Sequence, residues 1–145
     1  MDVELYDPLD YGNIGTHIAL VLSRQPVHPL PPEPFGGYGV YALYYCGSFH
    51  LYRGVAKKKG DAGPATPIYV GKALQGGRKG GSDGSKDLYS RLRDHGKSIQ
   101  QTANLKLGDF ECRYLPLVPV WIPLAEQLLI VSHRPIWNCY LDGFG

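Results

Sequence analysis

The sequence predicts a small α+β domain in which helices flank a short, mostly antiparallel sheet. Segments 38–47, 67–71 and 109–117 are rich in aromatic and β-branched residues, which is typical of strands. Segments 85–99 and 121–133 instead repeat their apolar residues at helical spacing. These elements follow one another as strand, strand, helix, strand and helix. The chain of 145 residues is long enough for one such domain with a buried core.

Residues 1–37 are expected to form an N-terminal arm or strap in front of a domain that spans residues 38–145. The arm is acidic at first and then carries five prolines between positions 26 and 34, which favour extended backbone. A short helical stretch is expected near residues 18–22.

The ends of the expected elements carry their own signals. Residues 48–56 are expected to form a hairpin with the first strand, and Pro67 indicates that the next strand begins there or lies at an edge. Ser85 is the expected N-cap of the middle helix, with Asp87 in its first turn. Pro123 near its start and Pro135 after its end delimit the last helix.

Positive charge is concentrated in the middle third of the chain. Residues 53–97 carry eleven Lys and Arg against four Asp, a net charge of +7, whereas residues 1–52 carry −4 and residues 98–145 carry −1. This asymmetry predicts a polyanionic partner, with nucleic acid first, and argues against a small-metabolite enzyme. A solvated, loop-rich segment is the alternative that charge alone leaves open.

The cysteines and the apolar runs indicate the compartment. The three cysteines are far apart and form no C-x-x-C motif, which argues against a disulfide framework and a structural zinc site. The acidic start lacks the basic region of a signal peptide, and no apolar run approaches the roughly 18 residues of a membrane span. We therefore expect a soluble protein of the cytosol without a membrane partner.

Candidate functional residues lie at the edge of the middle helix's buried face. Around the helix axis, His95 lies ~20° and Arg91 ~60° from Leu88, whereas Arg93 lies ~140° away. Arg93 is therefore expected to face solvent or a DNA backbone. Arg91 and His95 could serve a site together, or could be an ordinary surface cation and a hydrogen-bonded boundary residue.

The last helix carries a carboxylate on its core-facing side. Glu126 shares that face with Ile122, Leu129 and Ile130, where a charge needs a compensating cation or hydrogen bonds. It could pair with Arg91, or it could hold a metal ion. A hard oxygen ligand without His or Cys companions would suit Mg²⁺.

The segment Tyr69-Val70-Gly71-Lys72 could likewise be functional or purely structural. Gly71 would let a phosphate approach the backbone closely, and Lys72 would supply positive charge. The alternative is an ordinary strand end followed by a loop. Tyr41 is comparable with Tyr69, because each follows a β-branched residue in a predicted strand.

Taken together, these motifs resemble the GIY-YIG nuclease superfamily, and in particular its Type II restriction endonuclease branch. The paired words are Gly39-Val40-Tyr41 and Ile68-Tyr69-Val70-Gly71-Lys72. The downstream order Arg91, His95, Glu126 and Asn138 also fits, as do the segments GVYALYYCG, SRLRDHGKSI, NLKLGDFECRYL, WIPLAEQLLI and PIWNCYLDGFG. The resemblance spans roughly residues 36–145. The departures are GVY and YVG in place of GIY and YIG, and a long connection between Tyr41 and Tyr69 that suits the restriction branch.

The resemblance implies a DNA endonuclease with one Mg²⁺ per active site, for which Mn²⁺ can substitute. Glu126 would hold the ion, and Arg91 would neutralise charge on the phosphate. Tyr41 would accept the proton of the attacking water, and Tyr69 would position the water or the phosphate, although the two tyrosines could exchange roles. A free phenol has a pKa near 10, so Lys72 and His95 would have to lower the pKa of Tyr41. Asn138 would orient these groups.

The resemblance also implies the partners. The substrate would be double-stranded DNA, cut on both strands by a homodimer at a short palindrome, which the branch alone suggests is GC-rich. A DNA methyltransferase in the same bacterial cytosol would be the functional companion. Basic loops would grip the phosphates through Lys57, Lys58, Lys59, Arg78 and Lys79. The alternatives are a non-catalytic DNA-binding module on the same fold, or a repair or homing nuclease of the same superfamily.

Overall fold

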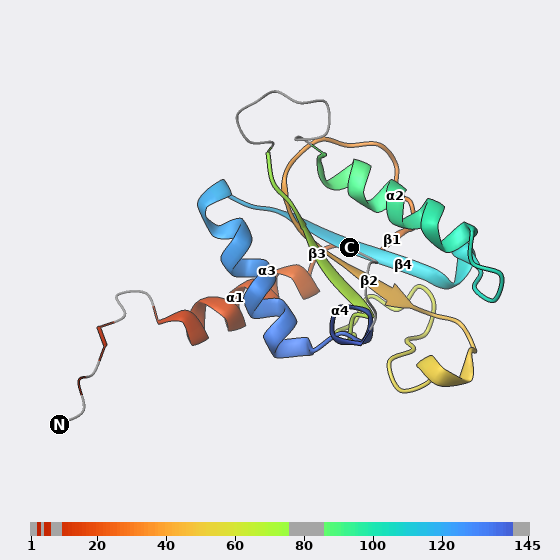
Figure 1. The fold of residues 1–145 in the computed structure, drawn as a ribbon, viewed down its shortest axis with the longest axis horizontal. Coiled ribbons are helices and arrows are strands. Elements are labelled where there is room, and N and C mark those ends of the chain that lie inside the picture. The colour runs from red at the N-terminus through yellow and green to blue at the C-terminus, as the bar shows by residue number, and fades with distance from the viewer. Residues whose placement is uncertain (1–2, 4, 7–9, 76–85, 141–145) are drawn as a thin grey trace.

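The computed structural model describes residues 3, 5–6, 10–75 and 86–140 (Figure 1). At its centre is a four-stranded sheet of order β1-β4-β2-β3, in which every pair of neighbouring strands is antiparallel. The strands are β1 (His28–Pro29), β2 (Gly39–Tyr45), β3 (Tyr69–Ala73) and β4 (Phe110–Pro116). The helices are α1 (Tyr11–Ser23), α2 (Leu88–Gln100), α3 (Ile122–His133) and α4 (Ile136–Cys139). None of these described helices is long and apolar enough to cross a membrane.

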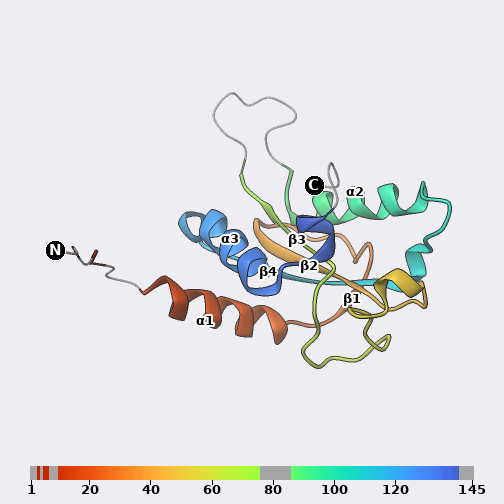
Figure 2. The same ribbon diagram turned by 60° about the horizontal axis from the view of Figure 1, so that its bottom comes forward.

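Every residue of β2 is buried, and its successive side chains point to opposite faces of the sheet. Both faces of the sheet are therefore covered. On one face lies a cluster under α2 that includes Tyr41, Leu43, Tyr45, Leu88 and Leu92. On the other face lies a cluster under α1 and α3 that includes Val40, Ala42, Tyr44, Ile18 and Leu129. Figure 2 shows α1 and α2 on opposite sides of the sheet. The predicted α+β class with an antiparallel sheet is thus confirmed.

Within residues 10–37, α1 and β1 pack on this sheet. The helix expected near residues 18–22 is longer and spans Tyr11–Ser23, because Ile14, Ile18 and Leu22 form an apolar stripe against the cluster under α3. β1 then pairs with β4, with His28 opposite Cys112. The expected division of the chain between residues 37 and 38 stays a prediction.

Two expectations about element ends are wrong. Residues 48–56 do not form a hairpin with β2, which pairs with β3 and β4; His50–Tyr52 form a 3-10 turn instead. The ring of Tyr52 packs edge-on against Tyr45 and Trp137, so this segment is held by aromatic contacts and not by a ladder. The N-cap of α2 is Asp87, whose side chain accepts a hydrogen bond from the Ser90 N–H at 2.8 Å. Ser85 lies outside the described residues.

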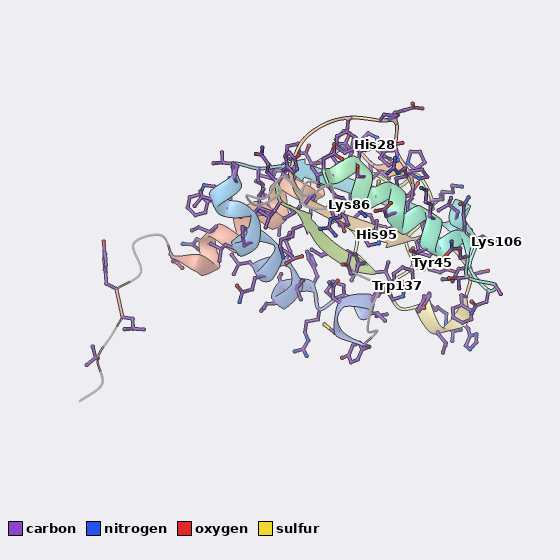
Figure 3. The ribbon with its side chains drawn as sticks, turned by 45° about the horizontal axis from the view of Figure 1, so that its top comes forward. His28, Tyr45, Lys86, His95, Lys106 and Trp137 are labelled. Atoms are coloured by element: carbon purple, nitrogen blue, oxygen red, sulfur yellow. The ribbon has the colours of Figure 1, made fainter. Side chains whose placement is uncertain are left out.

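β3 is an edge strand, as Pro67 predicts. Its outer side is covered by α4, and Figure 3 shows Trp137 beside it. The backbone N–H of Trp137 donates to the Ile68 carbonyl at 3.0 Å. Asn138 accepts from the Val70 N–H and donates to the Val70 carbonyl, both at 2.8 Å. The side-chain amide therefore bonds to Val70 as a neighbouring strand would.

Candidate active site

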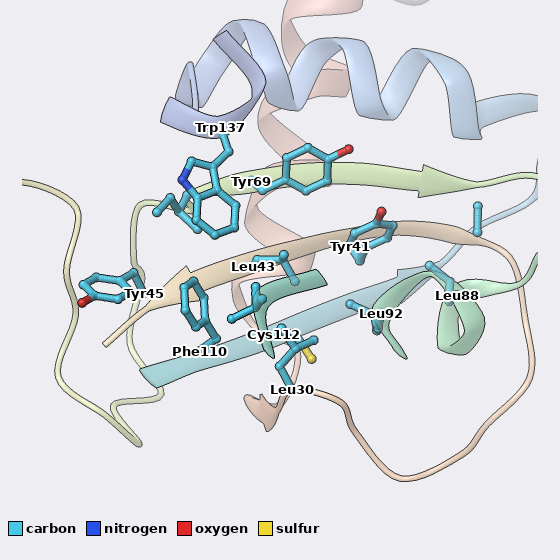
Figure 4. Packing of buried hydrophobic residues seen from close by; sticks show 13 residues of the cluster. Leu30, Tyr41, Leu43, Tyr45, Tyr69, Leu88, Leu92, Phe110, Cys112 and Trp137 are labelled. Carbon is cyan, nitrogen blue, oxygen red and sulfur yellow. The ribbon is translucent and has the colours of Figure 1, made fainter. Parts of the chain in front are cut away.

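β2 and β3 bring the two motif tyrosines onto the face of the sheet that α2 covers. Tyr41 lies opposite Gly71 in the ladder, and Tyr69 lies opposite Leu43. The two rings have centroids 6.2 Å apart, and Figure 4 shows both hydroxyls directed to the same side. Tyr41 is 2% exposed and Tyr69 is 7% exposed. The antiparallel register thus gathers residues that are 28 positions apart in the chain.

Packing explains both motif glycines. A Cβ on Gly71 would lie 2.4 Å from the Tyr41 hydroxyl oxygen, because the Tyr41 side chain crosses over the Gly71 backbone. A Cβ on Gly39 would lie 2.0 Å from the Leu115 carbonyl oxygen on β4. The expectation that Gly71 leaves room for a phosphate is therefore wrong, since Tyr41 fills that room.

α2 places His95 against the tyrosines, and Figure 3 shows it between α2 and the sheet. The Tyr41 hydroxyl lies 2.6 Å from His95 Nε2. Burial, reinforced by the charge of Arg91, lowers the pKa of His95 to about 4, so the imidazole is neutral at pH 7. Burial, reinforced by Tyr69, raises the pKa of Tyr41 well above its usual value. Tyr41 is therefore a neutral phenol hydrogen-bonded to Nε2 of a neutral imidazole, and the expectation that its pKa is lowered is wrong.

Arg91 lies at the same site with a donor to spare. Its Nε is buried and has no hydrogen-bond partner among the residues that the structure describes. Its positive charge lowers the pKa of both Tyr41 and Tyr69, in opposition to the stronger effect of burial. A buried guanidinium N–H without an acceptor suits an incoming oxyanion such as a phosphate.

Glu126 approaches the site from the other face of the sheet. Lys72 follows Gly71 and so points toward α3, where its Nζ donates to Glu126 Oε1 at 2.7 Å. The cation that pairs with Glu126 is thus Lys72 and not Arg91, while the metal-binding role of Glu126 stays a prediction. The charge of Glu126 also raises the pKa of Tyr41 and Tyr69, so the carboxylate lies within electrostatic range of both phenols. The site thus wraps around the edge strand β3.

The donor set fits a magnesium ion. The described ranges hold no group of three or more His, Cys, Asp or Glu side chains that could share a metal. The Glu126 side chain is 20% exposed and offers oxygen ligands. Mg²⁺ prefers oxygen and is commonly held by one or two carboxylates with several waters. Glu126 together with water could therefore hold the ion beside a phosphate on Arg91.

The lysines expected to bind DNA fall into two kinds. Lys58 and Lys59 are exposed on the connection between β2 and β3. The side chain of Lys57, by contrast, is only 6% exposed and forms an ion pair with Glu111 on β4. Its ammonium therefore already has an anionic partner within the protein.

The other expected DNA contacts lie elsewhere. Arg93 is exposed on α2, with its guanidinium 5.8 Å from the centroid of the Tyr89 ring. Arg78 and Lys79 lie outside the described residues. These DNA contacts all stay predictions.

Sequence reasoning missed two buried charges on β4. Besides Lys57, Glu111 accepts a hydrogen bond from the Gly60 N–H at 3.0 Å. Arg113 is fully buried and donates to the carbonyls of Gln25, Ala62 and Gly63. Both residues anchor the β2–β3 connection on the sheet. Polar residues at alternate strand positions normally indicate a solvent face, so the pattern could not reveal them.

The paired strands, the tyrosines and the neighbouring Arg, His and Glu define a nuclease of the GIY-YIG class. The family model described as the Eco29kI GIY-YIG domain matches residues 33–145, and the chain belongs to this restriction endonuclease family. The resemblance drawn from the motifs is confirmed. The family is one of deoxyribonucleases, so the substrate is DNA. No match to a curated protein was found.

Proposed function

We propose that this chain is a Type II restriction endonuclease that makes double-strand cuts at a short palindrome by Mg²⁺-dependent hydrolysis of phosphodiester bonds. The observation that carries the proposal is the hydrogen bond between the Tyr41 phenol and the neutral His95, next to the Nε of Arg91, for which the described part of the chain offers no acceptor. A proton acceptor behind a phenol and a free cationic donor are what hydrolysis of a phosphate diester needs.

The raised pKa of Tyr41 shapes its proposed role as the base. Burial disfavours ionisation of Tyr41 before the reaction. The phenol therefore has to give up its own proton while it accepts one from water. His95 Nε2 serves as the acceptor for that proton in this proposal, because it lies 2.6 Å from the Tyr41 oxygen and the imidazole is neutral at pH 7. Tyr69 then positions the water or the phosphate beside Tyr41.

The remaining residues bind and orient the phosphate. The Nε of Arg91 donates to a phosphate oxygen and compensates the charge that develops there. Glu126 would hold Mg²⁺, which when bound supplies Lewis-acid stabilisation to the phosphate and the leaving 3′ oxygen. Asn138 acts as a positioning residue, because it fixes the backbone of Val70 between Tyr69 and Gly71.

DNA binding and assembly complete the proposal. The exposed Lys58, Lys59 and Arg93 contact backbone phosphates, as do Arg78 and Lys79. A homodimer cuts both strands of the palindrome, and a DNA methyltransferase protects the same sites in the bacterial cytosol. Mn²⁺ can take the place of Mg²⁺.

Incubation of the protein with plasmid and phage DNA, with Mg²⁺ or with EDTA, tests this function. We expect discrete fragments with Mg²⁺ only, and sequencing of their ends should return one palindrome. Binding without cleavage would support a non-catalytic module. Cuts without a common sequence would support a nuclease of the repair or homing type.

A further inference from the structure

The ion pair between Lys72 and Glu126 places a protein cation on the carboxylate that the proposed function assigns to the metal. The Lys72 ammonium lies 2.7 Å from Oε1, and the two side chains are 35% and 20% exposed. Glu126 belongs to α3 and Lys72 to β3, so the pair bridges two elements that pack against each other. A buried stabilising pair would exclude water, whereas this one stays within reach of solvent ions.

The ammonium and a divalent cation compete for this carboxylate. A Mg²⁺–oxygen bond is about 2.0–2.1 Å long, so an ion on Oε1 would stand in the position that the ammonium now approaches. An ion on the other oxygen would still be repelled by a positive charge a few ångströms away. Either way, Lys72 weakens the binding of a metal ion by Glu126 in the DNA-free protein.

Lys72 can leave the carboxylate when another anion is offered. Its side chain has four flexible methylene groups and ends in a point charge that pairs readily with phosphate. Lys72 is bound to Glu126, and the charge of Glu126 reaches Tyr41 and Tyr69, so a phosphate at the two phenols would lie within electrostatic range of the ammonium. Transfer of the ammonium from Glu126 to the phosphate would then free the carboxylate for the metal.

We propose that Lys72 is an internal counterion that keeps the metal affinity of Glu126 low until DNA phosphate takes over the ammonium. Metal binding and DNA binding are therefore positively coupled, and the coupling is reciprocal. This inference rests on the proposed assignment of Glu126 as the metal ligand.

Mn²⁺ binding to the DNA-free protein, measured by electron paramagnetic resonance, tests the inference without any cleavage. We expect Lys72→Met to tighten Mn²⁺ binding by about tenfold, because the repelling charge is gone. Lys72→Arg keeps the charge and should retain the weak binding of the wild type. Lys86→Met is the matched control, since Lys86 forms a comparable 2.8 Å pair with a different carboxylate, that of Asp94, at the surface.

Glu126→Gln separates the two proposals. If it abolishes Mn²⁺ binding while Lys72→Met leaves the affinity at the wild-type value, the counterion role is overturned and the metal ligand stands. If Glu126→Gln binds Mn²⁺ as the wild type does, the metal assignment fails and the inference fails with it.

A second measurement addresses the coupling through DNA. Ca²⁺ in place of EDTA should tighten binding of a short random-sequence duplex by about tenfold in the wild type, because the metal releases Lys72 to the phosphate. The gain should be clearly smaller in Lys72→Met, which has no ammonium to release. DNA binding is measured by fluorescence anisotropy. An equal gain in DNA affinity with Ca²⁺ in the wild type and in Lys72→Met would overturn the coupling.

Discussion

Tyr41 is fixed from two sides, by the Gly71 backbone under its side chain and by His95 Nε2 at its hydroxyl. Both contacts join residues that are far apart in the sequence. Their geometry therefore depends on the register between β2 and β3 and on the distance of α2 from the sheet. At this scale the chemistry is set by burial, which keeps the phenol and the imidazole neutral.

Gly71→Ala tests the contact under the ring. The new methyl group would overlap the Tyr41 hydroxyl, so the ring must move away from His95. We expect a loss of stability of about 1–3 kcal/mol in thermal unfolding, together with a loss of DNA cleavage. Gly54→Ala is the control, because nothing lies within 4 Å of its added Cβ. Equal behaviour of the two variants would contradict the packing account.

Tyr41→Phe removes the hydroxyl but keeps the ring. In the proposed mechanism this removes the proton acceptor for water, so the cleavage rate should fall by a factor of about 10² or more. Circular dichroism should show that the fold is retained. If single-turnover cleavage of plasmid DNA proceeds at the wild-type rate, the base is another group, and Tyr69→Phe then tests the exchanged assignment.

His95 should make stability depend on pH. Its pKa is about 4 in the folded protein, so between pH 6.5 and 4 the unfolded chain binds a proton that the folded chain does not. Stability should therefore fall as the pH falls through this window, by on the order of 1 kcal/mol per pH unit. Denaturant unfolding at several pH values should show a shallower slope in His95→Asn. A remaining slope is expected from His133, whose pKa burial also lowers.

At the scale of elements, the sequence predicted the parts that depend on local pattern. Helical spacing placed Arg91 and His95 on the inner edge of one helix, and Pro67 marked the edge strand. The role of Gly71 could not be read this way, because it depends on a ring from another strand. The pKa shifts of Tyr41 and His95 could not be predicted from the sequence either, because they result from burial in the folded protein.

The three successive lysines show the same limit. The sequence offers Lys57, Lys58 and Lys59 as equivalent cations, yet only the first meets Glu111 on β4. The positions of Glu111 and Arg113 alternate as exposed residues would, so no local signal reveals that they are buried. The path of the β2–β3 connection across the sheet determines which of the three lysines forms the ion pair with Glu111.

Lysine variants can separate structural from DNA-binding charges. Lys57→Met leaves Glu111 with a partly buried charge and should destabilise the protein by about 3 kcal/mol. Lys58→Met and Lys59→Met should leave stability nearly unchanged. Each should instead reduce the slope of log affinity for DNA against log salt concentration by about 1. A stable Lys57→Met with a reduced salt slope would assign Lys57 to the DNA contact after all.

At the scale of the whole molecule, the sheet edge at β3 unites two sets of groups. The phenols, Arg91 and His95 lie on the α2 side, and Lys72 and Glu126 lie on the α3 side. In the sequence, β3 lies within the positively charged segment 53–97, and this charge suits a DNA substrate. We propose that Glu126 supports hydrolysis at this edge and is not needed to bind DNA.

Plasmid cleavage by Glu126→Ala tests that claim most directly. With Mg²⁺ present, the variant should show no detectable cleavage under conditions where the wild type digests the plasmid completely. In EDTA it should bind the same DNA at least as tightly as the wild type, because Lys72 is released to the phosphate. Cleavage by Glu126→Ala at the wild-type rate would contradict the account.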